Sequence, residues 1–277
     1  MKAILKQVIF DQQIILHDRW VERSIPQSLI ECNEVLVISG IRRCGKSVLL
    51  QQIRAKQTEK DYCLNFDDDR LSKFSVDNFQ QLYEVFIELF GEQKTFYFDE
   101  IQNISGWELF VRRIYDKGCK VFVTGSNAKM LSRELGTHLT GRYCSYELYP
   151  FSFSEYLDFI AVKIKTDDFY STVGVASLTK YFNQYLYEGG FPQYMISRNE
   201  IYLKSLYESI LYKDVMVRNK LTNEKEILEL VYFLASNVAK LSSYSSLARL
   251  LGLKHPVTVK NYIEHIENTY LIFQGFQ

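Results

Sequence analysis

The stretch "VLVISGIRRCGKSVLLQQI", residues 35–53, carries the most specific pattern in the chain. An apolar run, 35–39, ends at Gly40, and helical spacing of apolar residues begins after Ser47. Between the two lies the spacing G-x-x-x-x-G-K-S. A strand that continues into a helix through such a loop lets successive backbone amides curl around phosphate oxygens. The stretch therefore predicts a phosphate-binding loop.

Each residue type in this loop has a chemical reason. Gly40 and Gly45 permit the curled backbone, and the amino end of the following helix offers amides and a dipole to an anion. Lys46 is expected to reach the β- and γ-phosphates, and the Ser47 hydroxyl to ligate Mg²⁺. The predicted nucleotide-binding residues are Gly40, Ile41, Arg42, Arg43, Cys44, Gly45, Lys46, Ser47 and Val48. The two loop arginines could also face a partner or solvent.

A second motif, "KTFYFDEIQ", supplies the acidic partners that such a loop requires. Asp99 ends a run of apolar and aromatic residues, and Glu100 follows it directly. We expect Asp99 to hold Mg²⁺ together with Ser47, and Glu100 to act as the catalytic base that polarises the attacking water. A further strand and helix separate loop and acidic pair, an order that resembles the additional-strand, catalytic-glutamate division of phosphate-loop ATPases.

Polar residues after two later strands are further candidates. "KVFVTGSN" ends in Thr124 and Asn127, with Ser126 between them, and such side chains can sense a γ-phosphate. A plain Gly-Ser-Asn turn explains the same residues equally well. Arg142 follows a glycine at the start of the next strand, where an arginine can stabilise transition-state charge in the same chain or across a subunit. A solvated arginine is the alternative. "NFDDDR", residues 65–70, is expected to be a solvated loop.

Composition limits the class of protein. The 277 residues contain 33 Lys or Arg and 33 Asp or Glu, so no overall field attracts nucleic acid or an acidic membrane. The five cysteines show no CxxC spacing, which argues against a zinc site. The apolar stretch at the amino terminus is too short for a signal peptide, and no run has membrane-spanning length. We expect a soluble cytoplasmic protein without membrane contact.

The pattern along the chain predicts an α/β fold. Short apolar runs alternate with helical stretches between residues 34 and 150, which is typical of a parallel sheet covered on both faces. Amphipathic helices dominate after that. The predicted parts are an N-terminal arm, a phosphate-loop ATPase core, a helical lid and a winged-helix domain, at residues 1–33, 34–150, 151–220 and 221–277.

The assembled motifs resemble a widespread family of bacterial and archaeal ATPases in the AAA superfamily. The matching pieces are "GIRRCGKS", "YFDEIQ", "GWELFVRRIYDKG", "VTGSN", "LTGRYCSYELYPFSFSEYL", "YEGGFPQY" and "YKDVMVRNKL". The resemblance implies an ATPase core, a helical lid and a winged helix. Many members continue with a domain that resembles restriction endonucleases, and this chain stops where that part would begin. It is therefore expected to be a truncated or short member.

The C-terminal stretch "SSYSSLARLLGLKHPVTVKNYIEHIENTYLIF", residues 242–273, reads as a helix-turn-helix. Gly252 ends the first helix and Pro256 starts the second, whose polar face would carry Lys254, Lys260 and Asn261. From residue 219 onward there are six Lys or Arg and five Asp or Glu, a weak footprint for phosphate-backbone binding. The stretch is expected to contact either DNA or a protein.

The leading hypothesis is a Mg²⁺-dependent AAA-type ATPase that couples ATP hydrolysis to a DNA or protein partner through the winged helix. The alternative is an ATP-gated switch or adaptor with little turnover. A small-molecule kinase would require an acceptor pocket and a lid with paired arginines, and the sequence shows no such constellation. The oligomeric state does not follow from the sequence.

Overall fold

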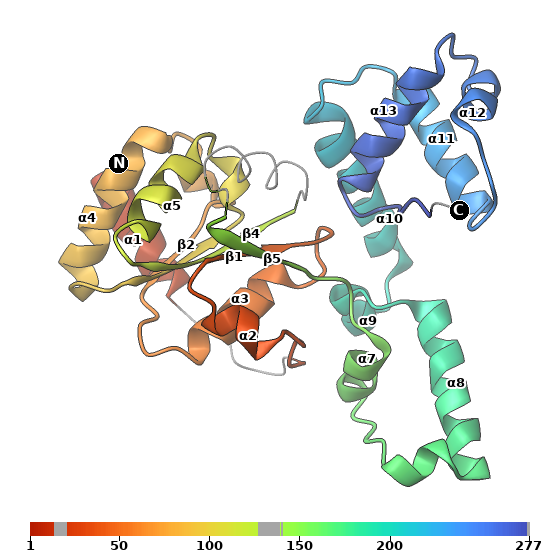
Figure 1. Cartoon of the computed structure of the whole chain (residues 1–277), viewed down its shortest axis with the longest axis horizontal. Coiled ribbons are helices and arrows are strands. Elements are labelled where there is room, and N and C mark those ends of the chain that lie inside the picture. The colour runs from red at the N-terminus through yellow and green to blue at the C-terminus, as the bar shows by residue number, and fades with distance from the viewer. Residues whose placement is uncertain (14–20, 127–138, 140, 276–277) are drawn as a thin grey trace. The chain divides into compact units, whose positions relative to one another are not determined.

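The computed structural model describes residues 1–13, 21–126, 139 and 141–275. Contacts divide the chain into two compact units, Met1–Arg198 and Asn199–Gln277 (Figure 1). The first unit contains the sheet and the predicted loop, and the described part of the second is helical.

A five-stranded sheet forms the centre of the first unit. Its strands are β1 (Val35–Ser39), β2 (Tyr62–Asn65), β3 (Thr95–Asp99), β4 (Lys120–Gly125) and β5 (Tyr143–Glu147). They lie in the order β2-β3-β4-β1-β5, and every neighbouring pair is parallel. The carboxyl ends of all five strands therefore meet at one edge, where ligands bind in open parallel sheets. The predicted α/β fold with a parallel sheet is confirmed.

Helices cover both faces of this sheet. On one face α1 (Lys2–Gln12), α4 (Phe79–Phe90) and α5 (Trp107–Tyr115) enclose a core that includes Phe96 and Phe98. On the other face α3 (Lys46–Ala55) packs on β3 and β4. There Tyr97 stacks on Phe122 with ring centroids 5.3 Å apart. Residues of β1 to β4 thus alternate between two buried faces, which is why these strands read as apolar runs, whereas the edge strand β5 is half-buried to exposed. The short α2 (Gln27–Glu31) precedes β1.

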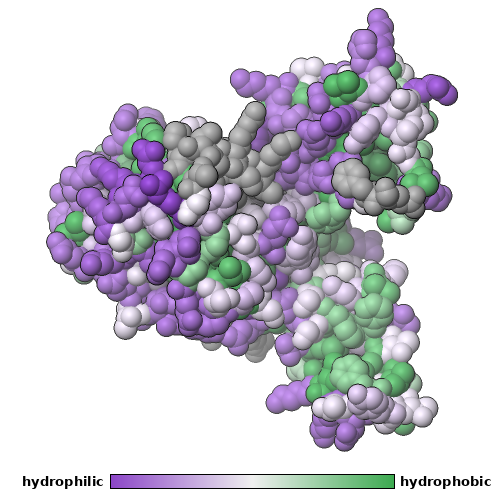
Figure 2. All heavy atoms as spheres, in the orientation of Figure 1, coloured by the Kyte–Doolittle hydropathy of each residue, from purple (hydrophilic) through white to green (hydrophobic). Residues whose placement is uncertain are grey.

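A helical segment follows β5 within the first unit. It contains α7 (Phe153–Phe159), α8 (Thr172–Glu188) and α9 (Pro192–Ser197). Ser152 and Glu155 form a capping box at the start of α7, each satisfying a backbone amide of the other. Helix α8 leaves much of its apolar surface exposed, as Figure 2 shows for this segment, including Val173 and Leu186.

The second unit begins with α10 (Glu200–Ser209), which continues into a π-helix, Ile210–Val217. The following helices are α11 (Glu224–Ser236), α12 (Tyr244–Leu250) and α13 (Pro256–Glu267). The π-helix packs its Leu211 and Val215 into the same core as these three helices, so it belongs to this unit.

Helices α12 and α13 pack together, with the Gly252 φ of 65° in the turn between them, as a helix-turn-helix requires. The described part of the second unit contains no strand, so the wing of a winged helix is not confirmed. The four-part division of the chain stays a prediction. Within the described ranges, no helix combines the length and the apolar composition needed to cross a bilayer.

Candidate nucleotide-binding site

The predicted loop joins β1 to α3 at the carboxyl edge of the sheet. Positive φ values occur at Gly40 (148°), Arg43 (67°) and Gly45 (105°), so the backbone reverses several times within six residues. A side chain at Gly40 would overlap the chain leaving β5, because its Cβ would lie 2.0 Å from the Leu148 carbonyl oxygen. This contact explains why the first glycine of the motif cannot be replaced without moving β5.

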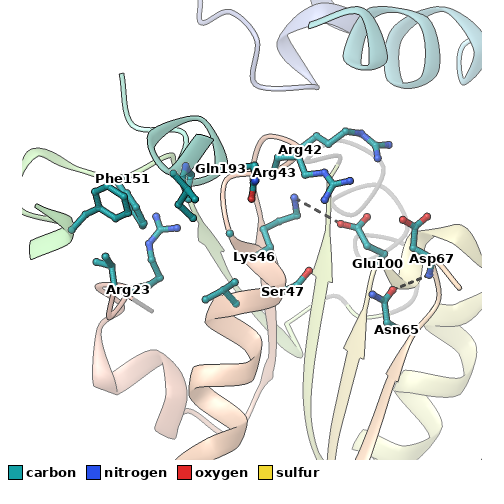
Figure 3. Close-up of a pocket in the computed structure, with 16 residues that line it drawn as sticks. Arg23, Arg42, Arg43, Lys46, Ser47, Asn65, Asp67, Glu100, Phe151 and Gln193 are labelled. Atoms are coloured by element: carbon teal, nitrogen blue, oxygen red, sulfur yellow. Dashed lines mark hydrogen bonds and ion pairs between the residues drawn. The ribbon is translucent and has the colours of Figure 1, made fainter. Parts of the chain in front are cut away.

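Lys46 opens α3 and is buried, with 4% of its surface exposed. Its Nζ donates hydrogen bonds to the carbonyl oxygens of Gly40, at 3.2 Å, and Ile41, at 3.1 Å. The same Nζ lies 3.9 Å from Oε1 of Glu100 (Figure 3). The lysine of the loop and the glutamate of the second motif therefore meet at one point.

Asp99 and Glu100 lie at the end of β3, as predicted, and Thr124 of β4 is hydrogen-bonded to both of them. The Thr124 hydroxyl donates to Oδ1 of Asp99 and accepts from the Glu100 backbone amide at 3.0 Å. Burial raises the pKa of Asp99, and hydrogen bonds from the hydroxyls of Thr124 and Ser47 oppose the rise. Ser47 and Asp99, the two oxygen-bearing side chains that were predicted to hold Mg²⁺, therefore lie close enough for the Ser47 hydroxyl to lower the pKa of Asp99.

Glu100 has a left-handed backbone, with φ 52°, which non-glycine residues rarely adopt. This conformation turns the chain from β3 into the short 3₁₀ helix Ile101–Asn103 and leaves the carboxylate facing Lys46 (Figure 3). The buried Gln102 side chain donates to Oε2 of Glu100 at 2.5 Å. Its Nε2 also lies 3.5 Å from Oγ of Ser126. Gln102 thus fixes the Glu100 carboxylate, a role that the sequence did not suggest.

Beside these groups lies a cavity of about 440 Å³ (Figure 3). Its lining comprises Val21, Arg23, Arg42, Arg43, Gly45, Lys46, Ser47, Val48, Asn65, Asp67, Glu100, Phe151, Phe159, Pro192, Gln193 and Ile196. The loop and the carboxylates form a charged end. The apolar side chains come from the arm before β1 and from the helices after β5. One charged and one apolar end are what a nucleotide requires.

Arg23, in the predicted N-terminal arm, is buried and lines the cavity together with the apolar side chains. It donates from Nη1 to the Cys44 carbonyl, from Nη2 to the Tyr149 carbonyl at 2.6 Å, and from Nε to Oε1 of Glu155 at 2.8 Å. Its guanidinium also lies over the Phe151 ring, 5.0 Å from the centroid. The arm shows no clear periodicity, so no signal in the sequence indicated this contact.

Not every predicted residue reaches the cavity. Among the described residues that line it, neither Thr124 nor Arg142 occurs. Arg142 immediately precedes β5 at the amino edge of the sheet, opposite the loop, and forms an ion pair with Asp116 at 3.3 Å. The expected action of Arg142 on the site of its own chain is therefore wrong, because the two lie at opposite ends of the parallel strands. Its action across a subunit stays a prediction. Asn127 lies outside the described residues.

The Arg23–Glu155 pair gives a testable pH dependence. Burial raises the pKa of Glu155, but hydrogen bonds from Arg23 and from the amides of Ser152 and Ser24 outweigh it and hold the pKa below 4.5. A carboxyl group whose pKa is lower in the folded than in the unfolded protein stabilises the fold at pH values above its unfolded-state pKa. That contribution is lost as the pH falls through the folded-state pKa. We expect Glu155→Gln to lower the free energy of unfolding by about 3 kcal/mol at neutral pH.

This difference should shrink once pH falls below 4.5, as measured by urea unfolding of both proteins over a pH series. The control is Glu22→Gln, which removes an exposed pair with Lys56 and should change stability by less than about 1 kcal/mol. A loss of stability in Glu155→Gln that is the same at every pH would contradict the assignment.

Residues 32–157 match the sequence model of a family described as an AAA domain. This segment is similar to AAA domains. The matched residues include the loop, the acidic pair and all five strands, so the expected resemblance to AAA-type ATPases is confirmed. Residues 179–276 match a second family, described as a domain of unknown function (DUF8612).

Two relatives extend over nearly the whole chain. An uncharacterised protein of Methanocaldococcus jannaschii is 35% identical over 282 residues, which cover 98% of this chain and 63% of that protein. An uncharacterised protein of Haemophilus influenzae is 31% identical over 269 residues, which cover 91% of this chain and 65% of that protein. The chain thus spans less than two thirds of the length of either relative.

Among solved structures, AMPPCP-bound DnaA from Aquifex aeolicus is 15% identical. The superposition covers 96% of this chain and 86% of the DnaA chain, with a TM-score of 0.32. A likeness at this level carries no information about function.

Proposed function

We propose that the chain is a Mg²⁺-dependent ATPase whose reaction takes place in the cavity beside the loop. The observation that carries the proposal is the convergence of two motifs, residues 40–47 and residues 99–100, which places Lys46 Nζ 3.9 Å from Oε1 of Glu100. Cation, hydroxyl and two carboxylates at the amino end of a helix are the groups that bind and cleave a triphosphate.

The loop would bind the phosphates. Its curled backbone and the first turn of α3 supply amides, and Lys46 would exchange its bonds to the Gly40 and Ile41 carbonyls for phosphate oxygens. Ser47 and Asp99 present the oxygen ligands that suit Mg²⁺. When bound, the ion neutralises charge on the phosphates. Because burial disfavours an ionised Asp99, a cation at this position would also relieve a cost that the protein carries without it.

Glu100 would act as the general base. Its carboxylate is anchored through Oε2 by Gln102, while Oε1 faces Lys46. Once Lys46 turns to the phosphates, Oε1 would be available to orient and polarise a water molecule. The left-handed backbone at Glu100 costs free energy, as is common where a catalytic side chain must point in one direction.

The apolar end of the cavity would hold the nucleoside. Phe151, Phe159, Pro192 and Ile196 supply apolar surface, and the Gln193 amide supplies both a donor and an acceptor for a base edge. A preference for adenine is part of the proposal and follows from the family.

A second candidate is an ATP-gated switch with little turnover. The hydrogen bond from Gln102 to Glu100 favours it, since a base engaged by a neighbouring amide is a weaker base. Its partner would be DNA or a protein, bound through residues 242–273.

One assay separates the two candidates. Steady-state phosphate release is measured with Mg·ATP, with and without duplex DNA, over a range of salt concentrations. Sustained turnover supports the ATPase, and stimulation by DNA that weakens steeply with salt supports a DNA partner. Tight ATP binding with near-zero turnover in every condition supports the switch. Failure to bind ATP contradicts both.

A further inference from the structure

The structure contains a buried connection between the phosphate loop and the helices that follow β5. Arg23 makes this connection from outside the AAA domain match, which begins at residue 32. Three of its donors reach three separate segments: the loop at Cys44, the chain after β5 at Tyr149, and α7 at Glu155. Arg23 is 5% exposed, so these bonds are shielded from water and each is costly to break.

The bond to Cys44 bears on phosphate binding through the geometry of the peptide. In a planar trans peptide the carbonyl and the next amide point in opposite directions. Holding the Cys44 oxygen towards Arg23 therefore aims the Gly45 N–H away from Arg23. Gly45 lines the cavity, and a Cβ on it would lie 2.7 Å from Arg23 Nη1, so the loop and the guanidinium are in close contact.

The other end of the connection is equally fixed. The Glu155 carboxylate accepts hydrogen bonds from Arg23 Nε, from the Ser24 amide at 3.1 Å and from the Ser152 amide at 2.8 Å. These bonds join the arm before β1 to the first turn of α7. The Phe151 ring lies under the guanidinium. The backbone amide of Phe151 donates a hydrogen bond to the Gly190 carbonyl, in the turn before α9, at 2.7 Å.

We propose that Arg23 is a positioning residue that couples the phosphate loop to α7 and to the turn before α9. The proposal rests on the nucleotide site described above and adds a specific route through it. Nucleotide binding that fixes the loop also fixes the start of α7, because both accept hydrogen bonds from one rigid guanidinium. By reciprocity, the position of α7 changes the affinity for the nucleotide by the same factor.

The test combines two measurements on the full chain, with Mg²⁺ and the non-hydrolysable analogue AMPPCP as the probe. The first is the dissociation constant. The second is hydrogen exchange of the amides in Phe153–Phe159, with and without the probe. In the unmodified protein we expect the probe to slow exchange in this helix, although α7 supplies Phe159 alone to the cavity lining.

Arg23→Met keeps the aliphatic stem and removes all three donors. We expect it to weaken binding of the probe about tenfold or more, the equivalent of one lost charged hydrogen bond, and to abolish the probe-dependent protection of α7. Glu155→Gln should reduce the protection while leaving the bond to Cys44 intact. Arg23→Lys should restore part of the affinity, since an ammonium can serve the loop carbonyl but cannot reach three segments at once.

The matched control is Arg54→Met. Arg54 is as buried as Arg23 and also donates to a backbone carbonyl, that of Lys60, but it lies at the far end of α3. This variant should lower the unfolding temperature yet keep both the affinity and the protection of α7. A purely structural role for Arg23 would give the same pattern as this control.

The outcomes separate the two proposals. Binding within twofold of the unmodified protein and unchanged protection of α7 in Arg23→Met would overturn the coupling and leave the nucleotide site in place. If Arg23→Met does not fold, unchanged affinity and protection in both Arg23→Lys and Glu155→Gln would overturn it instead. Absence of probe binding to the unmodified protein would contradict the nucleotide site, and the coupling with it.

Discussion

Replacing Lys46 by alanine is expected to abolish measurable nucleotide binding. The Lys46 ammonium is buried at the amino end of α3, surrounded by loop carbonyls and facing Glu100. Its contacts with two phosphates would each contribute about 1.5–3 kcal/mol, so their loss weakens binding about 100-fold or more. The measurement is equilibrium binding of a fluorescent ATP analogue with Mg²⁺.

Loss of fold must be separated from loss of binding, because Lys46→Ala leaves two loop carbonyls without their donor. Thermal unfolding of the variant serves this purpose, and Lys46→Arg retains the charge. The matched control is Lys56→Ala, which removes an exposed lysine that follows the same helix and pairs with Glu22. Binding by Lys46→Ala within tenfold of the unmodified protein would show that this lysine does not contact the phosphates.

Glu100→Gln is expected to retain nucleotide binding and to lose turnover. Glutamine preserves the shape of the side chain, but it cannot accept a proton from water, so phosphate release should fall about 10²- to 10⁴-fold. Removing a negative charge 3.9 Å from Lys46 should leave affinity for a triphosphate unchanged or improve it. Saturating steady-state assays together with binding measurements separate the two effects.

The control for this variant is Asp67→Asn, which neutralises another carboxylate that lines the same cavity. Asp67 is exposed and bonded to Asn65 through its own amide, so we expect its replacement to change turnover by less than about threefold. Normal turnover in Glu100→Gln would remove the general-base role, and an equal loss in both variants would assign the effect to total charge.

The sequence predicted the parts of the site that depend on local pattern. Gly40, Gly45 and Lys46 lie within one loop, and their spacing is decided by the backbone conformation that phosphate binding requires. Asp99 and Glu100 were found because a buried parallel strand reads as an apolar run, and the residues that end it lie at the ligand edge.

Contacts between distant segments could not be read in this way. Arg23 and Glu155 are 132 residues apart, and each is an ordinary charged residue in its own neighbourhood. Thr124 was expected to face the phosphate, yet its hydroxyl holds Asp99 and Glu100, a distinction that depends on which way one side chain points. Arg142 was correctly placed at the start of a strand, but the starts of parallel strands lie at the edge of the sheet opposite the loop.

The helical regions show a similar limit. The spacing around Gly252 and Pro256 predicted a helix-turn-helix, and α12 and α13 have that form. Helical periodicity identifies a buried face but not the body that it packs against. The π-helix Ile210–Val217 was therefore grouped with the lid, although its apolar residues complete the core of the second unit.

The central claim is that loop and acidic pair form one site for a triphosphate and its metal ion. It is tested most directly by calorimetric titration of ATP, with and without Mg²⁺, into the unmodified protein and into Asp99→Asn. We predict that Mg²⁺ strengthens ATP binding to the unmodified protein and that Asp99→Asn loses this gain while still binding metal-free ATP. An equal effect of Mg²⁺ on both proteins, or no binding of ATP to the unmodified chain, would contradict the claim.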